Sequence, residues 1–345
     1  MTTSPEVLSF DDALGSSTQQ TRHVLLGNGF SIACRPDRFT YNALLDEAAF
    51  PAASADIRSV FELLGTTDFE RVIDVLQLAA ALAETYATSD PSLSERLQSD
   101  ASVVREALAQ VLAAKHPDLP FDIEEDEYVS ARHFLANFER IYTINYDMLL
   151  YWTTMQDIEP SVARNDGFGS SDDEAADYVV WEPYAGFRSQ RVFFLHGGLH
   201  LYDRSFELAK ITWSRTSIPL VDQIRHALAE GRYPLIVTEG TSNDKVTKIL
   251  HHAYLTHAIR SFSLIGGALF VYGLSLAPND EHLLRRIAEG KTTDVYVSLY
   301  GDPDSPTNQS VIKRAQGLAD ERARSNPKVP LAVQFYDAES AHVWR

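Results

Sequence analysis

The chain has 345 residues, 45% of them hydrophobic, and a formal net charge of −18 from 30 Lys and Arg against 48 Asp and Glu. The single cysteine, Cys34, excludes an intrachain disulfide framework and any zinc site built on four cysteines or on two cysteines and two histidines. Because phosphate attraction needs clustered Lys and Arg, this acidic balance argues against direct binding of nucleic acid.

Residues 1–22 are read as a polar leader that lacks the apolar core of a secretory signal. The most apolar stretch, 264–277 (LIGGALFVYGLSLA), is about 14 residues long and interrupted by glycines, whereas a membrane-spanning helix needs about 20. We therefore expect a cytoplasmic protein without a membrane partner.

The first buried strand is expected at residues 23–27, where an apolar run ends in a glycine turn. Apolar residues then recur at helical spacing, for example Phe69, Val72 and Ile73, with Asp68 as the expected N-cap. The interval before the next strand is too long for a simple crossover. Residues 38–138 are therefore predicted to form a helical insertion after the first strand.

Further strands and helices alternate along the rest of the chain. Strands are predicted at 140–144, 191–195, 234–238, 268–272, 294–300 and 331–336, and helices at 222–229, 244–261, 279–289 and 308–324. This alternation is typical of an α/β fold with a doubly wound, mostly parallel, Rossmann-like sheet covered on both faces. Residues 23–345 are expected to form a single domain, and the acidic segment 165–177 an exposed loop.

Four polar or glycine-rich motifs each follow a predicted strand, at the edge where doubly wound sheets bind ligands. They are GNGFS at 27–31, TINYD at 143–147, HG at 196–197 and YGLSLAPND at 272–280. Gly27 and Gly29 would let backbone N–H groups approach a pyrophosphate, and Ser31 could donate to a phosphate oxygen. The alternatives are structural: plain turns, helix caps by Asp147 and Asp280, and a histidine satisfied within the core.

Two of these motifs carry side chains suited to catalysis. Asn145, at a strand end, could hydrogen-bond ribose hydroxyls or position a water, and His196 stands where an apolar strand meets paired glycines. No P-loop, HExxH, GxSxG or EF-hand sequence competes with this interpretation, and no metal is expected.

The order GxGxS, TxNxD, HG and GxSL resembles that of the sirtuin-type Rossmann domain. The forms GNGFS, YTINYDMLLYW, FFLHGGLHLY and YGLSLAPNDEHLL are similar to those of divergent sirtuin-like NADases of bacterial antiphage defence, over about residues 23–336. The resemblance implies a fold that binds NAD as substrate and hydrolyses it to ADP-ribose and nicotinamide, depleting the cell of NAD. It also implies that Asn145 and His196 are the catalytic residues.

The resemblance implies a set of dinucleotide-binding residues as well. They are Gly27, Gly29, Ser31, Gly273 and Ser275, and the motifs themselves add Asn28, Phe30, Thr143, Asp147, Gly197 and Asp280 to the predicted binding set. Protein-deacetylating sirtuins carry a four-cysteine zinc ribbon, which one cysteine cannot build, so water is the expected acceptor. A zinc-free ADP-ribosyltransferase or deacylase and a non-catalytic NAD or ADP-ribose sensor remain open alternatives.

A toxic NADase should be restrained until it is needed. We therefore expect a homo-oligomer and a protein partner that acts as sensor or activator. The helical insertion and the acidic segment 165–177 are candidates for gating or for oligomer contacts, and the alternative is that the helices form a cap that completes the core.

Overall fold

The computed structural model describes residues 5–54, 56–86, 92–169, 177–182, 189–204, 207–212, 218–238 and 242–345. At its centre lies a seven-stranded, all-parallel sheet in the order β1-β11-β10-β9-β2-β3-β6. These strands are β1 (Val7–Leu8), β2 (Arg22–Leu26), β3 (Arg140–Thr143), β6 (Val192–Phe194), β9 (Gly266–Tyr272), β10 (Lys291–Leu299) and β11 (Ala332–Asp337). The predicted α/β class with a doubly wound, Rossmann-like sheet is confirmed.

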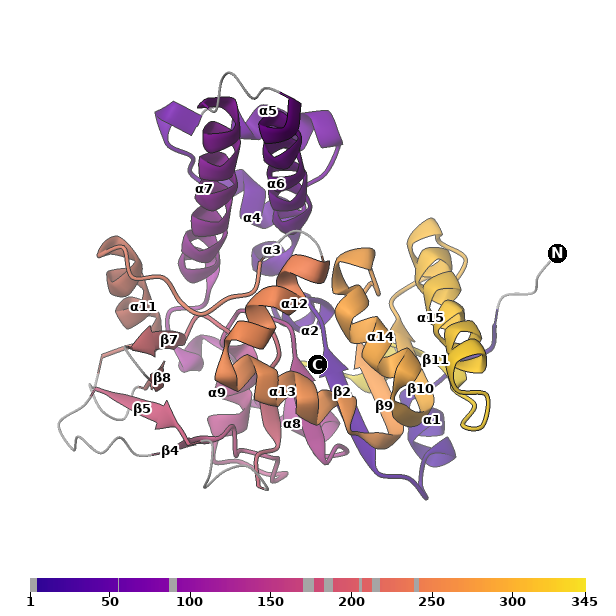
Figure 1. Cartoon of the computed structure of the whole chain (residues 1–345). Coiled ribbons are helices and arrows are strands. Elements are labelled where there is room, and N and C mark those ends of the chain that lie inside the picture. The colour runs from indigo at the N-terminus through magenta and orange to yellow at the C-terminus, as the bar shows by residue number, and fades with distance from the viewer. Residues whose placement is uncertain are drawn as a thin grey trace.

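Helices lie on both sides of this sheet (Figure 1). They are α1 (Phe10–Ser16), α2 (Gly29–Cys34), α3 (Pro36–Phe39), α4 (Tyr41–Glu47), α5 (Ile57–Leu64), α6 (Phe69–Tyr86), α7 (Ser92–Lys115), α8 (Glu125–Leu135), α9 (Leu149–Met155), α11 (Leu220–Ala229), α12 (Ser242–His251), α13 (Ala253–Ser263), α14 (Glu281–Glu289) and α15 (Pro306–Ser325). Among the described helices, none combines the length and apolar character needed to cross a membrane.

The strands are apolar because both of their faces are covered. Phe10 of α1 packs edge-on against Phe270 of β9 on one face, and Phe262 of α13 packs against Tyr142 of β3. In the strand register Val24 pairs with Phe270, whereas its neighbour Leu25 pairs with Tyr142, so the two aromatic contacts lie on opposite faces.

Between β2 and β3 the chain forms helices α2 to α8. Of these, α6 and α7 pack against each other and project away from the sheet (Figure 1). The Oδ1 atom of Asp68 accepts hydrogen bonds from the backbone N–H groups of Glu70 and Arg71, which is the predicted N-cap of α6. In contrast, α8 packs onto the sheet through Phe134, which contacts Phe10 and Tyr272.

The predicted strand at 234–238 is wrong. Its backbone instead runs beside the segment after β6: Leu235 N–H donates to the carbonyl of Leu201, and Val237 N–H donates to that of His196. Only an isolated bridge joins Ile236 to Gly197. Because Pro234 has no N–H to donate, this segment is poorly suited to be a central strand, which needs hydrogen bonds to neighbours on both sides.

Three further features differ from the predictions. The leader contributes β1, which pairs with β11, so the domain includes residues predicted to precede it. A small antiparallel sheet was not predicted; its strands are β4 (Phe168–Gly169), β5 (Tyr178–Trp181), β7 (Leu201–Arg204) and β8 (Glu207–Ile211).

The predicted helix at 244–261 is two helices, with His252 as the N-cap of α13. Most of the acidic segment 165–177 lies outside the described residues.

The environment of Cys34 gives a direct check of this packing. The side chain is buried in the core, and burial raises the pKa of its thiol to about 12. At pH 8 the thiolate is then about a thousandfold scarcer than in an ordinary cysteine, and the thiolate is the reactive form. We expect negligible reaction with a disulfide reagent in the folded protein and rapid, complete reaction in 6 M guanidinium; rapid reaction without denaturant would contradict the packing.

Candidate functional site

A cavity of about 600 Å³ lies at the carboxyl ends of the central strands. Its lining includes residues that follow β2, β3, β9 and β10, and the helical region closes it with Tyr41, Glu70 and Leu108. The strand order reverses between β2 and β9, because the chain continues outward to β3 on one side and to β10 on the other. In open α/β sheets this switch point is where ligands bind.

The glycine turn after β2 packs directly on the turn after β9. Gly29 N–H donates to the carbonyl of Gly273 at 2.8 Å, and a Cβ on Gly29 would lie 2.4 Å from the Gly273 Cα. Gly273 itself has φ +67°, in the left-handed region that favours glycine. The glycines at both positions are therefore required by close backbone approach. Asn28, Gly29, Gly273 and Ser275 line the cavity.

Gly29→Ala is expected to disrupt this contact. The new Cβ would collide with backbone atoms, so α2 must shift, and overpacking of this kind costs about 1–3 kcal/mol. Urea denaturation should report the loss of stability. Gly317→Ala is the matched control, because a Cβ there meets no atom within 4 Å and alanine favours the interior of α15. Equal effects of the two substitutions would contradict the close packing of the turns.

Asn145 is held at the cavity by its own amide group. Its Nδ2 donates to the Gly27 carbonyl at 2.9 Å and to Ser31 Oγ at 3.0 Å, and its backbone N–H donates to Thr143 Oγ1 at 3.0 Å. Within the described part of the chain, Oδ1 has no recorded hydrogen-bond partner, and Asn145 lines the cavity. The carboxamide oxygen is therefore available to a ligand there.

Asp147 also lines the cavity and is nearly fully buried. It accepts a hydrogen bond from Ser31 Oγ at 2.5 Å and one from the N–H of Leu149 at 2.9 Å. The second contact joins Asp147 to the first residue of α9, but the N-cap residue of that helix is Met148, not Asp147 as predicted. Burial raises the pKa of its carboxyl above the usual range.

Several predicted ligand-contacting residues have supporting positions instead. Ser31 is fully buried and donates its hydroxyl hydrogen to Asp147, so it does not donate to a phosphate in this conformation. Phe30 packs against Trp344, whose Nε1 donates to the Phe30 carbonyl at 2.9 Å. At Gly197 a Cβ would lie 1.9 Å from the Leu235 carbonyl oxygen, and φ is +76°. Among the described residues, the cavity lining does not include these positions, Gly27 or Thr143.

His196 lies beside the cavity without lining it. Its side chain is 1% exposed, and its Nε2 lies 2.9 Å from His282 Nε2. Asp280, which lines the cavity, stands close to both rings. Burial, with smaller contributions from Lys245 and His282, lowers the pKa of His196 well below its ordinary value, and burial lowers that of His282 to about 3. Both imidazoles are therefore neutral at physiological pH.

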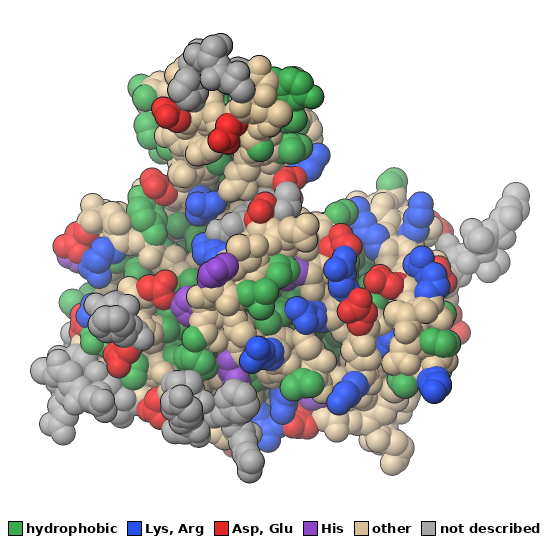
Figure 2. Space-filling view, viewed as in Figure 1, with side chains coloured by type: hydrophobic (Ala, Val, Ile, Leu, Met, Phe, Trp, Pro, Cys, Tyr) green, Lys and Arg blue, Asp and Glu red, His purple; other side chains and the backbone are tan. Residues whose placement is uncertain are grey.

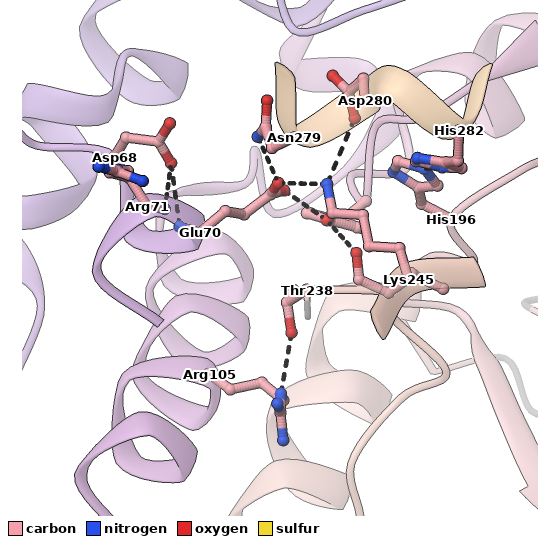
Figure 3. A network of polar contacts seen from close by, with 12 residues as sticks. Asp68, Glu70, Arg71, Arg105, His196, Thr238, Lys245, Asn279, Asp280 and His282 are labelled. Carbon is pink, nitrogen blue, oxygen red and sulfur yellow. Dashed lines mark hydrogen bonds and ion pairs between the residues drawn. The ribbon is translucent and has the colours of Figure 1, made fainter. Parts of the chain in front are cut away.

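A buried ion-pair network adjoins these histidines (Figure 3). Lys245 Nζ lies 2.6 Å from Glu70 Oε2 and 3.3 Å from Asp280 Oδ1. Asn279 Nδ2 and Tyr146 Oη donate to the Glu70 carboxylate. Burial raises the pKa of Asp280 to about 6, and the neighbouring Lys245 opposes this shift. The network connects α6 of the helical region to α12 and to the segment before α14.

A model of the DUF4917 family, described as a domain of unknown function, matches residues 24–344. The chain belongs to this family. No curated protein matches the chain significantly. The DUF4917 match runs from β2 to Trp344, so it includes both glycine turns, Asn145 and His196.

Two charged residues beside the cavity, Glu70 and Lys245, were not predicted from the sequence. Glu70 comes from the helical insertion, and Lys245 from a helix that carries no motif. One signal was present: Lys245 and Ile249 are four residues apart and both buried, so a lysine occupies the apolar face of α12. Lysine is almost never fully buried without a partner, and this position indicates a buried acidic group.

Proposed function

We propose that the protein is an NAD glycohydrolase that cleaves the bond between nicotinamide and ribose. The observation that carries the proposal is the placement of a close-packed glycine turn at the switch point between β2 and β9, with the Asn145 carboxamide at the end of the adjacent strand β3. The activity itself and its setting in antiphage defence, by NAD depletion in the cytoplasm, follow from the resemblance of the four motifs.

The strand order suggests how a dinucleotide would lie. Since β3 and β10 flank the β2–β9 pair on opposite sides, Asn145 lies toward one end of the cavity and Ser298 and Tyr300 toward the other. A diphosphate over the glycine turns would direct the nicotinamide ribose to Asn145 and the adenosine to the end of β10. The volume of about 600 Å³ falls in the usual range for small-molecule sites.

Backbone strain also marks this edge of the sheet. Leu276 has φ +54°, an uncommon conformation for a leucine, in the turn that carries Ser275 into the cavity. Strain of this kind costs about 1–3 kcal/mol and concentrates at ligand-binding sites. It supports a binding role for the turn after β9.

In the proposed reaction, the N-glycosidic bond breaks and its electron pair leaves with nicotinamide. Positive charge develops at C1′ of the ribose, as in glycosidase transition states. A water oxygen then bonds to C1′ and gives up one proton, leaving ADP-ribose. Asn145 Oδ1 would accept a hydrogen bond from the ribose or from that water, and His196 would accept the proton as general base.

The buried position of His196 means that this reaction requires a rearrangement. To reach the cavity, the imidazole would have to pass Asp280, which lines the cavity and is held by Lys245. The conformation described here is therefore proposed to be a resting state. The same observation favours a second candidate function, a non-catalytic NAD or ADP-ribose sensor, because such a module needs the cavity and not the histidine. A zinc-free ADP-ribosyltransferase or deacylase would differ from a hydrolase in the acceptor alone.

We propose that control of the resting state involves other protein chains. Figure 2 shows hydrophobic side chains on the surface of the projecting helical region. Leu63, Leu78, Leu82 and Tyr86 of α5 and α6 are more than half exposed. An apolar surface of this kind suits contact with another copy of the chain or with a sensor or activator protein.

The test is incubation of the purified full chain with NAD, followed by chromatography and mass spectrometry. Nicotinamide and ADP-ribose in equal amounts are expected from a hydrolase, and modified protein would indicate transfer. His196→Gln should lose the activity while retaining the circular dichroism spectrum. If NAD binds tightly without turnover, alone and in an extract of phage-infected cells, the sensor replaces the hydrolase; wild-type turnover by His196→Gln would remove the histidine from the mechanism.

A further inference from the structure

Three buried side chains with metal-binding atoms meet beside the cavity. His196 follows β6, while Asp280 and His282 are two residues apart at the start of α14. One ligand atom from each lies within 4.8 Å of the others. The two Nε2 atoms are 2.9 Å apart, and the ring centroids are 5.1 Å apart with an interplanar angle of 22°, so the Nε2 corners of the two rings point at each other (Figure 3).

This spacing is close to that of ligands on one metal ion. Zn²⁺ lies about 2.0–2.1 Å from an imidazole nitrogen and about 2.0–2.2 Å from a carboxylate oxygen, so two atoms on the same ion are about 3–3.4 Å apart. The histidine pair already lies at nearly this distance, but its Nε2 atoms point at each other, so the rings have to tilt to direct both nitrogens at one ion. The Asp280 carboxylate has to move by at most about 1.5 Å to join it.

The surrounding charges also favour an added cation. Glu70 and Asp280 are two carboxylates that share one ammonium group, that of Lys245. The shorter contact, 2.6 Å, is with Glu70, and the contact with Asp280 is 3.3 Å. Lys245 can therefore stay paired with Glu70 when Asp280 turns toward an ion. The bound ion would then balance the negative charge of the Asp280 carboxylate.

We propose that His196, His282 and Asp280 form a binding site for one divalent transition-metal ion of the zinc class. Two imidazole nitrogens with one carboxylate oxygen suit Zn²⁺ and its neighbours, whereas Mg²⁺ and Ca²⁺ prefer all-oxygen sites. This departs from the expectation of a metal-free protein. Three protein ligands leave at least one coordination position for water or a small ligand.

The ion would also determine what His196 can do. A metal bound at Nε2 uses the lone pair that a general base needs, and it holds the ring beside His282, out of the cavity. Zn²⁺ is therefore expected to inhibit NAD cleavage. This consequence rests on the proposed NAD glycohydrolase activity; the metal site itself does not.

Binding is tested by titrating the EDTA-treated, dialysed full chain with Zn²⁺ in a calorimeter and by recording the zinc X-ray absorption spectrum. One ion per chain is expected, with two imidazoles in its coordination shell. His282→Gln should weaken binding at least tenfold. His251→Gln should leave it unchanged, because His251 is an exposed histidine on α12.

The outcomes separate the site from the enzyme. No binding, full affinity in His282→Gln, or a wild-type spectrum with fewer than two imidazoles would overturn the metal site and leave a hydrogen-bonded histidine pair. The wild-type spectrum decides the question even if the variant does not fold. If zinc binds as expected and the metal-free protein cleaves no NAD, either alone or in an extract of phage-infected cells, the metal site stands and the proposed NAD glycohydrolase fails.

Discussion

Asn145→Ala is expected to reduce NAD cleavage by a factor of about 10²–10⁴ or more, because it removes the carboxamide that would hold the ribose or the attacking water. The substitution also removes the Nδ2 contacts to Gly27 and Ser31, which lie 2.9 and 3.0 Å away. Stability should fall by only about 1–3 kcal/mol, since these are two neutral hydrogen bonds. Steady-state assays of nicotinamide release, with circular dichroism and thermal unfolding alongside, measure both effects.

The control for this substitution is Asn42→Ala, an exposed asparagine on α4. It should leave both activity and melting temperature unchanged. Nicotinamide release by Asn145→Ala at the wild-type rate would exclude a catalytic role for the strand-end carboxamide.

Lys245→Met is expected to have the largest effect on stability. The lysine is fully buried and is the ammonium partner of Glu70 and Asp280. Removing one member of a buried ion pair leaves uncompensated charge and costs about 3–5 kcal/mol. Urea denaturation followed by circular dichroism should show this loss. Since Glu70 lies on α6, the projecting helices should also lose protection from hydrogen exchange.

Two further variants sharpen this test. Lys313→Met, on the exposed side of α15, should change stability by less than about 0.5 kcal/mol. Adding Glu70→Gln to Lys245→Met should recover part of the lost stability, because it removes one of the unpaired carboxylates. Additive losses in the double variant would mean that Lys245 and Glu70 do not interact as the 2.6 Å contact indicates.

The sheet was predictable because its strands are buried on both faces and therefore read as apolar runs. Val24, Leu25 and Leu26 of β2 and the run 268–272 of β9 are all buried. The short strand β1 was not predictable, since two half-buried residues in a polar segment carry no periodicity. Residues 234–238 have the composition of a strand, but their backbone groups pair with residues 196–201, between β6 and the start of β7, and do not join the central sheet.

The cavity-lining residues were predictable where a polar or glycine-rich motif directly follows a strand. Asn145, Asp147, Gly273 and Ser275 all line the cavity, as does Asp280. The sequence could not show which motif residues line the cavity and which support the lining residues. Ser31, for example, donates its hydroxyl hydrogen to Asp147, and this orientation depends on how α2 packs. Nor could it show that a helix far along the chain brings Lys245 to Glu70, because that contact joins residues 175 apart.

A crystal structure of the protein with ADP-ribose tests the central claim most directly, that the cavity at the β2–β9 switch point is an NAD site. The diphosphate is expected over the turns at Gly29 and Gly273, the terminal ribose within hydrogen-bond distance of Asn145, and the adenosine toward the end of β10. ADP-ribose bound outside this cavity, or bound with its adenosine at Asn145, would contradict the account.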